Sequence, residues 1–324
     1  MRYRGFYGNC EFSEEDQVYW GKIKLEKDLC TYESDTYDQI ETEFHRAVDD
    51  YLLTCEEFGK AIPALTFYLF VNSSKSLALS LEEKIKEYLV GKGQKLTSEL
   101  EEADILLSLG GDGTFIRAAN LIHDQGLNTP IFGINCGTLG YLTEGTKHTV
   151  WECLDQIIAR KFMEEDRARI WGECIDGGEE LRGTGLNEIL LAKKDTGILT
   201  FDILVNGQYL MELRADGMIC STPTGATGYA LSCGGSFLTP TSNLFQLTPL
   251  APHTLLNRSF VLDESACVEL MLNPGCEANM VVDGNCLGTI HGGYTLKIKL
   301  SKNTTKVISV ERDSFIHRIS QNFT

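Results

Sequence analysis

The sequence is short of positive charge. It has 29 lysine and arginine residues against 46 aspartate and glutamate residues, which gives a formal net charge of −17 at pH 7. A field of that sign repels phosphate backbones, so no nucleic-acid partner is expected, although a local basic pocket for a small anion is still allowed. Long apolar runs are also missing: none approaches the roughly 20 residues that a membrane helix needs, so no membrane association is expected.

Paired cysteine motifs are absent as well. The 11 cysteines include no Cys-x-x-Cys pair and no Cys/His set at zinc-like spacing. Their number is odd, the chain is long, and its first residues do not have the pattern of a signal peptide. We therefore expect reduced thiols in a cytoplasmic protein.

What is present is the composition of an ordinary globular protein, arranged in parts. Residues 1–60 predict a small α+β domain, with a strand followed by an amphipathic helix. Strands and helices then alternate over residues 64–148, which predicts a parallel α/β domain that binds a nucleotide. Residues 149–310 consist mostly of short strands and predict a β-sandwich-like domain. We expect the tail, residues 311–324, to pack back on the α/β domain.

A glycine turn stands out in the α/β part. The apolar strand at 104–109 ends at GGDGT, residues 110–114, and a helix follows at once. The turn is neither a Walker A loop nor a GxGxxG loop. Free amides at a helix N-terminus bind phosphate, so a carboxylate there needs a purpose. Asp112 could cap the helix, with Thr114 as an alternative cap, or it could accept a proton or hold Mg²⁺.

Four further motifs follow along the chain. A second glycine turn spans residues 132–144, after another strand of the same sheet, and ligands bind at the carboxyl ends of such strands. Asn187-Glu188 begins a strand, residues 213–235 are dense in Asp, Thr, Gly and Ser, and residues 280–285 contain an Asp-Gly turn. Each motif alone also fits ordinary turn chemistry.

Taken in order, these motifs resemble those of the NAD kinase family, over about residues 64–320. GGDGT alone is shared with diacylglycerol kinases, sphingosine kinases and 6-phosphofructokinases, but the Asn-Glu and Thr-Pro-Thr-Gly blocks are not typical of those relatives. The resemblance implies transfer of the ATP γ-phosphate to the 2′-hydroxyl of the adenosine ribose of NAD, with Mg²⁺ or another divalent metal. It also implies a homodimer or a homotetramer.

The resemblance assigns roles to individual residues. Asp112 would be the general base, Asn187 and Glu188 would bind NAD, and Tyr141 would pack near the adenine. Arg214 and Asp216 would hold the nucleotide. The phosphates would be lined by Gly110, Gly111, Gly113 and Thr114. The remaining NAD-binding positions would be Thr227, Gly228, Tyr229, Ala230, Leu231, Ser232 and Asn285, with Asp112 and Gly113 also in contact; no metal ligand is assigned.

The sequence departs from the family pattern at three positions. The common Thr-Gly-Ser-Thr-Ala-Tyr has Ala226 in place of the serine and Gly228 in place of the alanine. Gly197 stands where some members have His or Arg. We expect these changes to weaken binding or to alter the preference between NAD and NADH.

The first 60 residues resemble the N-terminal domain of HicB-type antitoxins, without the DNA-binding segment that commonly follows it. This part could serve oligomerisation or bind a protein partner. Two other functions stay open for the whole chain. One is a lipid or sugar kinase that shares GGDGT, and the other is a non-catalytic protein that senses NAD or binds a partner.

Overall fold

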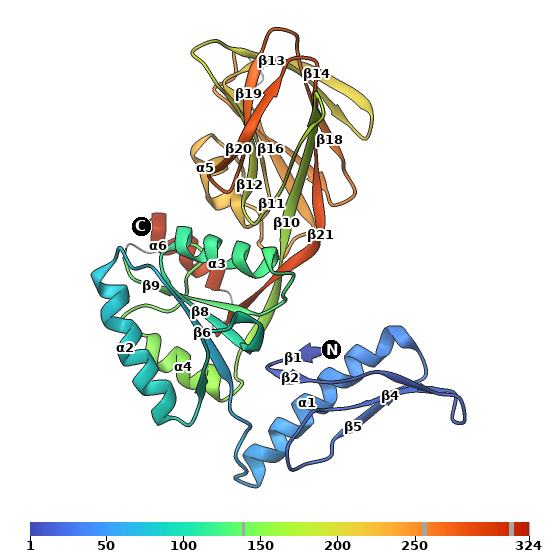
Figure 1. Ribbon diagram of the computed structural model, residues 1–324, viewed down its shortest axis with the longest axis vertical. Coiled ribbons are helices and arrows are strands. Elements are labelled where there is room, and N and C mark those ends of the chain that lie inside the picture. The colour runs from blue at the N-terminus through green and yellow to red at the C-terminus, as the bar shows by residue number, and fades with distance from the viewer. Residues whose placement is uncertain (138–139, 255–257, 311–313, 324) are drawn as a thin grey trace.

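The computed structural model describes residues 1–137, 140–254, 258–310 and 314–323 (Figure 1). In Figure 1 a β-rich part lies above an α/β part, and the small N-terminal part lies below and to the side. The second glycine turn and the C-terminal tail each include residues outside the described ones, namely 138–139, 311–313 and 324.

The N-terminal part is α+β. Strands β1 (Arg2–Tyr3) and β2 (Phe6–Tyr7) pair with each other, and β3 (Glu11–Ser13), β4 (Val18–Lys22) and β5 (Thr31–Ser34) form an antiparallel sheet. After a short turn, η1 (Tyr37–Gln39), helix α1 (Ile40–Glu57) packs on this sheet. As its spacing predicts, α1 buries one apolar face, made of Ile40, Phe44, Val48, Tyr51 and Cys55.

Polar contacts join this part to the α/β part. The buried Arg160 guanidinium lies over the Phe6 ring, 5.2 Å from its centroid, and donates to the Pro63 carbonyl at 2.9 Å. Burial lowers the pKa of Arg160 to about 10. The Tyr7 hydroxyl adds a hydrogen bond to the Asp104 carboxylate at 3.0 Å. The N-terminal part is therefore fixed to the α/β part by specific contacts as well as by the connecting residues 61–63.

The α/β part contains the predicted parallel strands, in the order β9-β8-β6-β7. Helices α2 and α4 cover one face of this sheet and α3 covers the other. Its elements are β6 (Thr66–Val71), α2 (Ser76–Gly91), β7 (Lys95–Leu96), η2 (Leu100–Glu102), β8 (Ile105–Gly110), α3 (Asp112–Asp124), β9 (Ile131–Asn135) and α4 (Val150–Ile158). Helix α3 begins three residues earlier than the sequence suggests, directly at the glycine turn.

The β-rich part consists of two sheets that pack face to face over one apolar core. One sheet has the order β17-β16-β15-β12-β19-β20, and β13, β14 and β18 belong to the other. Its elements are β10 (Met163–Asp176), β11 (Glu179–Gly185), β12 (Glu188–Lys193), β13 (Leu199–Val205), β14 (Gln208–Ala215), β15 (Gly217–Ser221), η3 (Gly225–Thr227), α5 (Tyr229–Ser232), β16 (Leu244–Leu250), β17 (Phe260–Asp263), β18 (Val268–Leu272), β19 (Glu277–Val282), β20 (Asn285–His291) and β21 (Thr295–Ser309).

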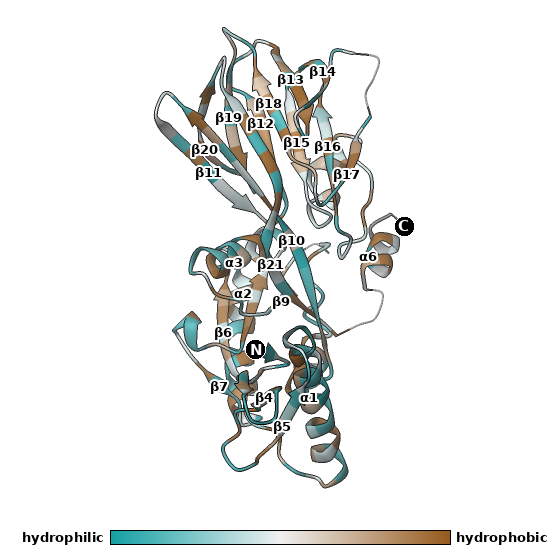
Figure 2. Cartoon of the chain, turned by 90° about the vertical axis from the view of Figure 1, so that its right-hand side faces the viewer, coloured by the Kyte–Doolittle hydropathy of each residue, from teal (hydrophilic) through white to brown (hydrophobic). Residues whose placement is uncertain are grey.

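Two long strands connect the α/β and β-rich parts. β10 and β21 pair antiparallel along most of their length, with a bulge near Ala168, and both run from one part into the other. β21 pairs with β18 at one end and, through Val307 and Ile131, with parallel strand β9 at the other. The two parts therefore share one continuous sheet, which the sequence did not reveal. Figure 2 shows helix α6 (Ser314–Phe323) beside the junction.

Two general features complete the fold. None of the 11 cysteines, all of which lie in the described part of the chain, forms a disulfide. Within the described residues, no helix is both long enough and apolar enough to cross a membrane.

Candidate active site

Asp112 lies between the two glycine turns. Its carboxylate accepts hydrogen bonds from the backbone amides of Tyr141, at 2.7 Å, and Leu142, at 3.1 Å. The N-cap of α3 is Gly111, and no side chain caps the helix. The capping role that the sequence left open is therefore wrong for Asp112. Its side chain faces the second glycine turn, across the carboxyl ends of the strands.

The glycines allow this close approach. The backbone amide of Cys136 donates to the carbonyl of Gly110 at 2.5 Å, which joins the ends of β9 and β8. A Cβ at Gly140 would lie 2.0 Å from an oxygen of Asp112. A Cβ at Gly110 would lie 2.2 Å from the Thr114 hydroxyl. A side chain at Gly140 would push the turn and the carboxylate apart, and one at Gly110 would displace Thr114.

Asn187 and Glu188 come from the β-rich part, where β12 begins. The Asp283 carboxylate, in the turn between β19 and β20, accepts hydrogen bonds from the backbone amides of both residues, at 2.8 and 3.1 Å. It also accepts one from the amide of Leu186 at 2.7 Å. Three successive amides held by one carboxylate fix the direction in which the two side chains leave the strand.

A loop from the Thr-Pro-Thr-Gly block covers this pair. Thr222 donates through its hydroxyl to the Leu186 carbonyl at 2.6 Å and through its amide to the Asn187 carbonyl at 2.8 Å. Gly225 sits so close that a Cβ there would lie 2.1 Å from the Asn187 carbonyl oxygen. A Cβ at Gly228 would lie 3.6 Å from Glu188 Oε2. The loop and the pair therefore form one compact cluster.

This cluster contains buried polar atoms that have no protein partner. Within the described part of the chain, four such atoms gather where β12 begins and β15 ends: Asn187 Oδ1, Glu188 Oε2, Ser221 Oγ and Thr224 Oγ1. Buried polar atoms are nearly always hydrogen-bonded, so a group of orphans in one place indicates a polar ligand. Ser221 lies within the Ser- and Thr-rich stretch 213–235 but was not predicted individually, because its place beside Glu188 depends on the pairing of β15 with β12.

Burial changes the acidity of Glu188. Desolvation, with a smaller contribution from the Asp283 charge, raises the pKa of Glu188 from 4.5 to about 7. Near neutral pH this carboxyl can therefore either donate or accept a hydrogen bond. Perturbed carboxyls of this kind gather at functional sites.

The pKa of Glu188 predicts a stability that depends on pH. The folded state holds the Glu188 proton more tightly than the unfolded chain does. The stability that this proton contributes is therefore fully present below pH 4.5 and is lost as the pH rises through about 7. Replacing Glu188 by glutamine should leave unfolding unchanged near pH 4.5. Above pH 7 it should stabilise the protein by up to about 3 kcal/mol. Urea unfolding at both pH values measures this.

The exposed Glu264 supplies a matched control for that experiment. Glu264→Gln should not change the difference in unfolding free energy between the two pH values. If Glu188→Gln behaved like Glu264→Gln, the raised pKa would be contradicted.

The candidate phosphate-binding residues differ in exposure. Gly113 is exposed and Gly111 is half-buried, so both can meet a ligand. Thr114 is buried, and its hydroxyl accepts hydrogen bonds from Asn72 at 3.2 Å and Arg117 at 3.4 Å. Its side chain anchors the turn to the end of β6.

The structure separates Arg214 and Asp216 from Asn187 and Glu188. Asp216 forms an ion pair with Lys193 at 2.7 Å, at the far end of β12 from Glu188. The two ends of that strand are about 17 Å apart at about 3.3 Å per residue. Arg214 is exposed on β14.

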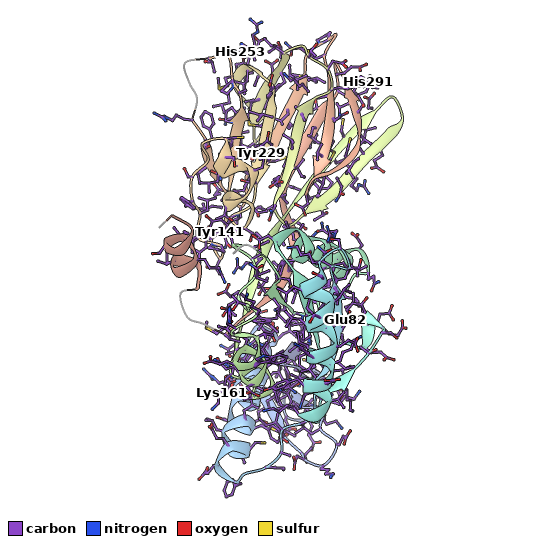
Figure 3. All side chains as sticks on the ribbon, turned by 90° about the vertical axis from the view of Figure 1, so that its left-hand side faces the viewer. Glu82, Tyr141, Lys161, Tyr229, His253 and His291 are labelled. Carbon is purple, nitrogen blue, oxygen red and sulfur yellow. The ribbon has the colours of Figure 1, made fainter. Side chains whose placement is uncertain are left out.

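The other predicted nucleotide-binding residues lie near the Thr-Pro-Thr-Gly loop and the Asp283 turn. Tyr229 begins α5 and is exposed. Desolvation raises the pKa of its hydroxyl, with smaller contributions from Cys233 and from the charge of Asp216, which therefore lies nearby. Figure 3 shows Tyr141 at the level of the junction between the two parts, with Tyr229 above it in the β-rich part. Ala230 is buried, Ser232 and Asn285 are exposed, and Thr227 and Leu231 are half-buried.

A buried polar network ties the two halves of the site together, and sequence reasoning missed it. Arg169, which is fully buried on β10, donates to the Asn120 side chain at 2.5 Å. Asn120, on the same helix as Asp112, donates to the Asp283 carboxylate at 3.0 Å. Asp283 in turn holds the amides that begin β12. Helix α3 and strand β12 are therefore linked through the Asn120 and Asp283 side chains, and Arg169 joins β10 to the same network.

Helix α6 reaches the same region. The buried Arg318 guanidinium lies 3.9 Å from the Glu144 carboxylate, which follows the loop that holds Asp112. A small cavity at the junction is lined by Phe115, Leu142, Leu186, Thr224 and Arg318, among others. The residues that flank Asp112, Asn187 and the Thr-Pro-Thr-Gly loop thus meet in one place.

A carboxylate held between two glycine turns, together with a cluster of unpartnered polar atoms where the β-rich part meets the α/β part, defines a nucleotide-binding site of the phosphotransferase class. Comparison with known proteins gives the family. The sequence profile of the ATP-NAD kinase N-terminal domain matches residues 43–162, and that of the ATP-NAD kinase C-terminal domain matches residues 186–310. The chain belongs to the NAD kinase family.

Individual relatives with this similarity are named NAD kinases as well. The chain is 33% identical over 262 residues to the NAD kinase of Flavobacterium psychrophilum, an alignment that covers 77% of this chain and 88% of the relative. It is 34% identical over 248 residues to the NAD kinase of Gemmatimonas aurantiaca, covering 75% of this chain and 84% of the relative.

Two solved structures share the fold. Yeast NADH kinase complexed with NADH matches with a TM-score of 0.68 at 19% identity, covering 81% of this chain and 88% of the other. The NAD kinase from Archaeoglobus fulgidus in complex with ATP matches with a TM-score of 0.63 at 24% identity, covering 79% of this chain and 97% of the other. The α/β part followed by a sheet-rich part, which the sequence predicted, is confirmed.

Proposed function

We propose that this chain is an NAD kinase in which Asp112 is the general base. The 2′-hydroxyl of the adenosine ribose of NAD gives its proton to the Asp112 carboxylate as its oxygen bonds to the γ-phosphorus of ATP. The bond from that phosphorus to the bridging oxygen breaks, and ADP leaves. A ribose hydroxyl is a poor nucleophile near neutral pH, so a positioned carboxylate accelerates this step.

The observation that carries this proposal is the position of the Asp112 carboxylate. Two backbone amides hold it at the carboxyl ends of the parallel strands, where such sheets bind ligands. The polar atoms of Asn187 and Glu188, across the junction, would recognise NAD. Thr227 to Ser232, Tyr141, Arg214, Asp216 and Asn285 would complete the dinucleotide site. Gly110, Gly111, Gly113 and Thr114 would form the phosphate turn.

A divalent metal, Mg²⁺ in the simplest case, would offset the charge of the triphosphate. The described residues contain no group of three or more His, Cys, Asp or Glu side chains arranged to hold a metal. The ion would be bound to the triphosphate of ATP.

The test is NADP formation from NAD, ATP and Mg²⁺ by the purified full chain, with diacylglycerol and a sugar as alternative acceptors. NADP as the product supports the proposal. A folded chain that binds NAD without turnover would show a sensor, and transfer to the lipid or the sugar alone would show another kinase of the GGDGT group.

We propose in addition that residues 1–60 are a HicB-type antitoxin-like domain that binds a protein partner, and that the chain forms a cytoplasmic homodimer or homotetramer. The N-terminal part has its own apolar core, and residues 1–42 lie outside both matched ranges. Light scattering tests the assembly, and the mass of a single chain would contradict it. A pull-down with the full chain that recovers no partner would count against the docking role.

A further inference from the structure

Basic side chains gather beside the two glycine turns, although the chain carries a net charge of −17. A cleft of about 350 Å³ opens next to the end of β9 and is lined by Asn135, Gly137, Thr146, Lys147 and His148, together with Leu77. Gly137 belongs to the second glycine turn. A cleft with this lining, in an acidic protein, favours an anion of the size of a phosphate chain.

Lys75 places its ammonium group over both glycine turns. A Cβ at Gly137 would lie 2.8 Å from Lys75 Nζ, and a Cβ at Gly111 would lie 3.6 Å from it. Burial raises the pKa of the neighbouring Cys136 thiol, and the nearby Lys75 charge partly offsets that rise. Lys75 Nζ is therefore beside the first turn and the second turn at once.

The local sequence holds Lys75 in this place. Asn72, directly after β6, accepts hydrogen bonds through its side-chain oxygen from the Ser74 amide at 3.1 Å and hydroxyl at 2.7 Å. The Lys75 amide donates to the Asn72 carbonyl at 3.0 Å, and Asn72 also donates through its side chain to Thr114. The loop after β6 is thereby tied to the first turn of α3.

The Lys75 ammonium has no carboxylate partner among the described residues, in contrast to Lys86 on the same helix, which pairs with Glu82 and Glu83. Lys75 is the N-cap of α2, and no side chain caps that helix. The first amides of α2, at Ser76, Leu77 and Ala78, have no partner within the helix, whose first hydrogen bond joins Leu79 to Lys75. A cation at the start of a helix, close to two glycine turns, is an arrangement that suits phosphate.

We propose that Lys75 binds the phosphate chain of the donor from beside the cleft at the end of β9, whose lining residue Gly137 lies next to the ammonium group. This inference rests on the proposed NAD kinase activity. It adds a residue that the motifs do not contain, because Lys75 follows β6, about 35 residues before GGDGT along the chain and in contact with it only in the folded sheet. The glycines provide the close approach, and Lys75 provides the charge.

The test compares Lys75→Gln with Lys84→Gln. Lys84 lies exposed on the same helix, so both variants lose one positive charge from α2. Losing a hydrogen bond to a charged group should raise the KM for ATP about 10–100-fold in Lys75→Gln and leave the KM for NAD unchanged. Lys84→Gln should change neither value. Lys75→Arg should keep most of the ATP affinity.

Inorganic triphosphate serves as a probe without a nucleoside. It should compete with ATP in the wild type, and its inhibition constant should rise in Lys75→Gln by the same factor as the KM for ATP. A wild type that makes NADP, together with a Lys75→Gln variant whose ATP and triphosphate constants are unchanged, would overturn the inference and leave the proposed function standing. If the wild type makes no NADP, the proposed function fails. Calorimetric binding of triphosphate to the wild type and to Lys75→Gln then still decides the role of Lys75.

Discussion

Replacing Asp112 by asparagine should slow NADP formation about 10²–10⁴-fold, the usual cost of losing a general base. The effect should fall on kcat, because the carboxylate takes the proton in the reacting complex. The KM for NAD should change little. Steady-state rates with NAD and ATP varied independently measure this.

Asp112→Asn also needs a control for folding, because each carboxylate oxygen accepts a hydrogen bond from a backbone amide of the second glycine turn. The asparagine oxygen can keep one of these hydrogen bonds and its NH₂ group cannot accept the other. We expect a small loss in the unfolding midpoint and retained NAD binding. If a folded Asp112→Asn protein kept full activity, the role of Asp112 as base would be contradicted.

Replacing Asp283 by alanine should destabilise the protein more than any of the other substitutions discussed. Its carboxylate accepts hydrogen bonds from the amides of Leu186, Asn187 and Glu188 and from the Asn120 side chain. Hydrogen bonds to a charged acceptor contribute about 1.5–3 kcal/mol each and are not additive, so we expect a total loss of about 3–5 kcal/mol. Urea unfolding measures the loss, and the KM for NAD should rise as Asn187 and Glu188 lose their direction.

Asp263 offers a matched control, because its carboxylate is exposed. Among the described residues, the Ser265 hydroxyl is the one side-chain group that donates a hydrogen bond to it, and the Ser265 amide donates as well. Asp263→Ala should cost less than about 1 kcal/mol. Asp283→Asn should be intermediate, since it keeps one acceptor oxygen. Equal losses for Asp283→Ala and Asp263→Ala would refute the linking role of Asp283.

Local patterns were enough to predict the elements around the site. The continuous apolar strand before GGDGT, the helical spacing of the residues after it and the alternation of Leu296 and Ile298 with lysines each depend on neighbours in the chain. Leu296 and Ile298 are indeed fully buried, and Leu300, the third apolar residue of that alternation, is half-buried. The order of strands and helices then gives a parallel sheet, and with it the edge where a nucleotide binds.

Features that depend on distant pairing could not be predicted in this way. Ser221 reaches the candidate site only because β15 pairs with β12, and Lys75 only because β6 lies beside β8. The continuity of β10 and β21 through both parts likewise depends on register between residues that are 124 (Glu173 and Lys297) to 146 (Met163 and Ser309) positions apart in the chain. The periodicity of apolar residues predicts which face of an element is apolar, but it does not predict which other element packs against that face.

The choice between a helix cap and a catalytic base at Asp112 also needed the structure. Both roles require a carboxylate at the start of a helix, so the sequence permits either. The amides of Tyr141 and Leu142 turn the side chain away from the helix and toward the second glycine turn. That orientation excludes the cap, while the roles of general base and of Mg²⁺ ligand stay predictions for this carboxylate.

The most direct test is to identify the product that the full chain forms from NAD, ATP and Mg²⁺. Phosphorus NMR distinguishes a new phosphomonoester on the 2′-oxygen of the adenosine ribose from one on the 3′-oxygen or on another acceptor. We predict a single new 2′-phosphomonoester, with ADP in equal amount, from the wild type and almost none from Asp112→Asn. No phosphorylated NAD from a folded wild type, or phosphate on any other atom, would contradict the proposed reaction.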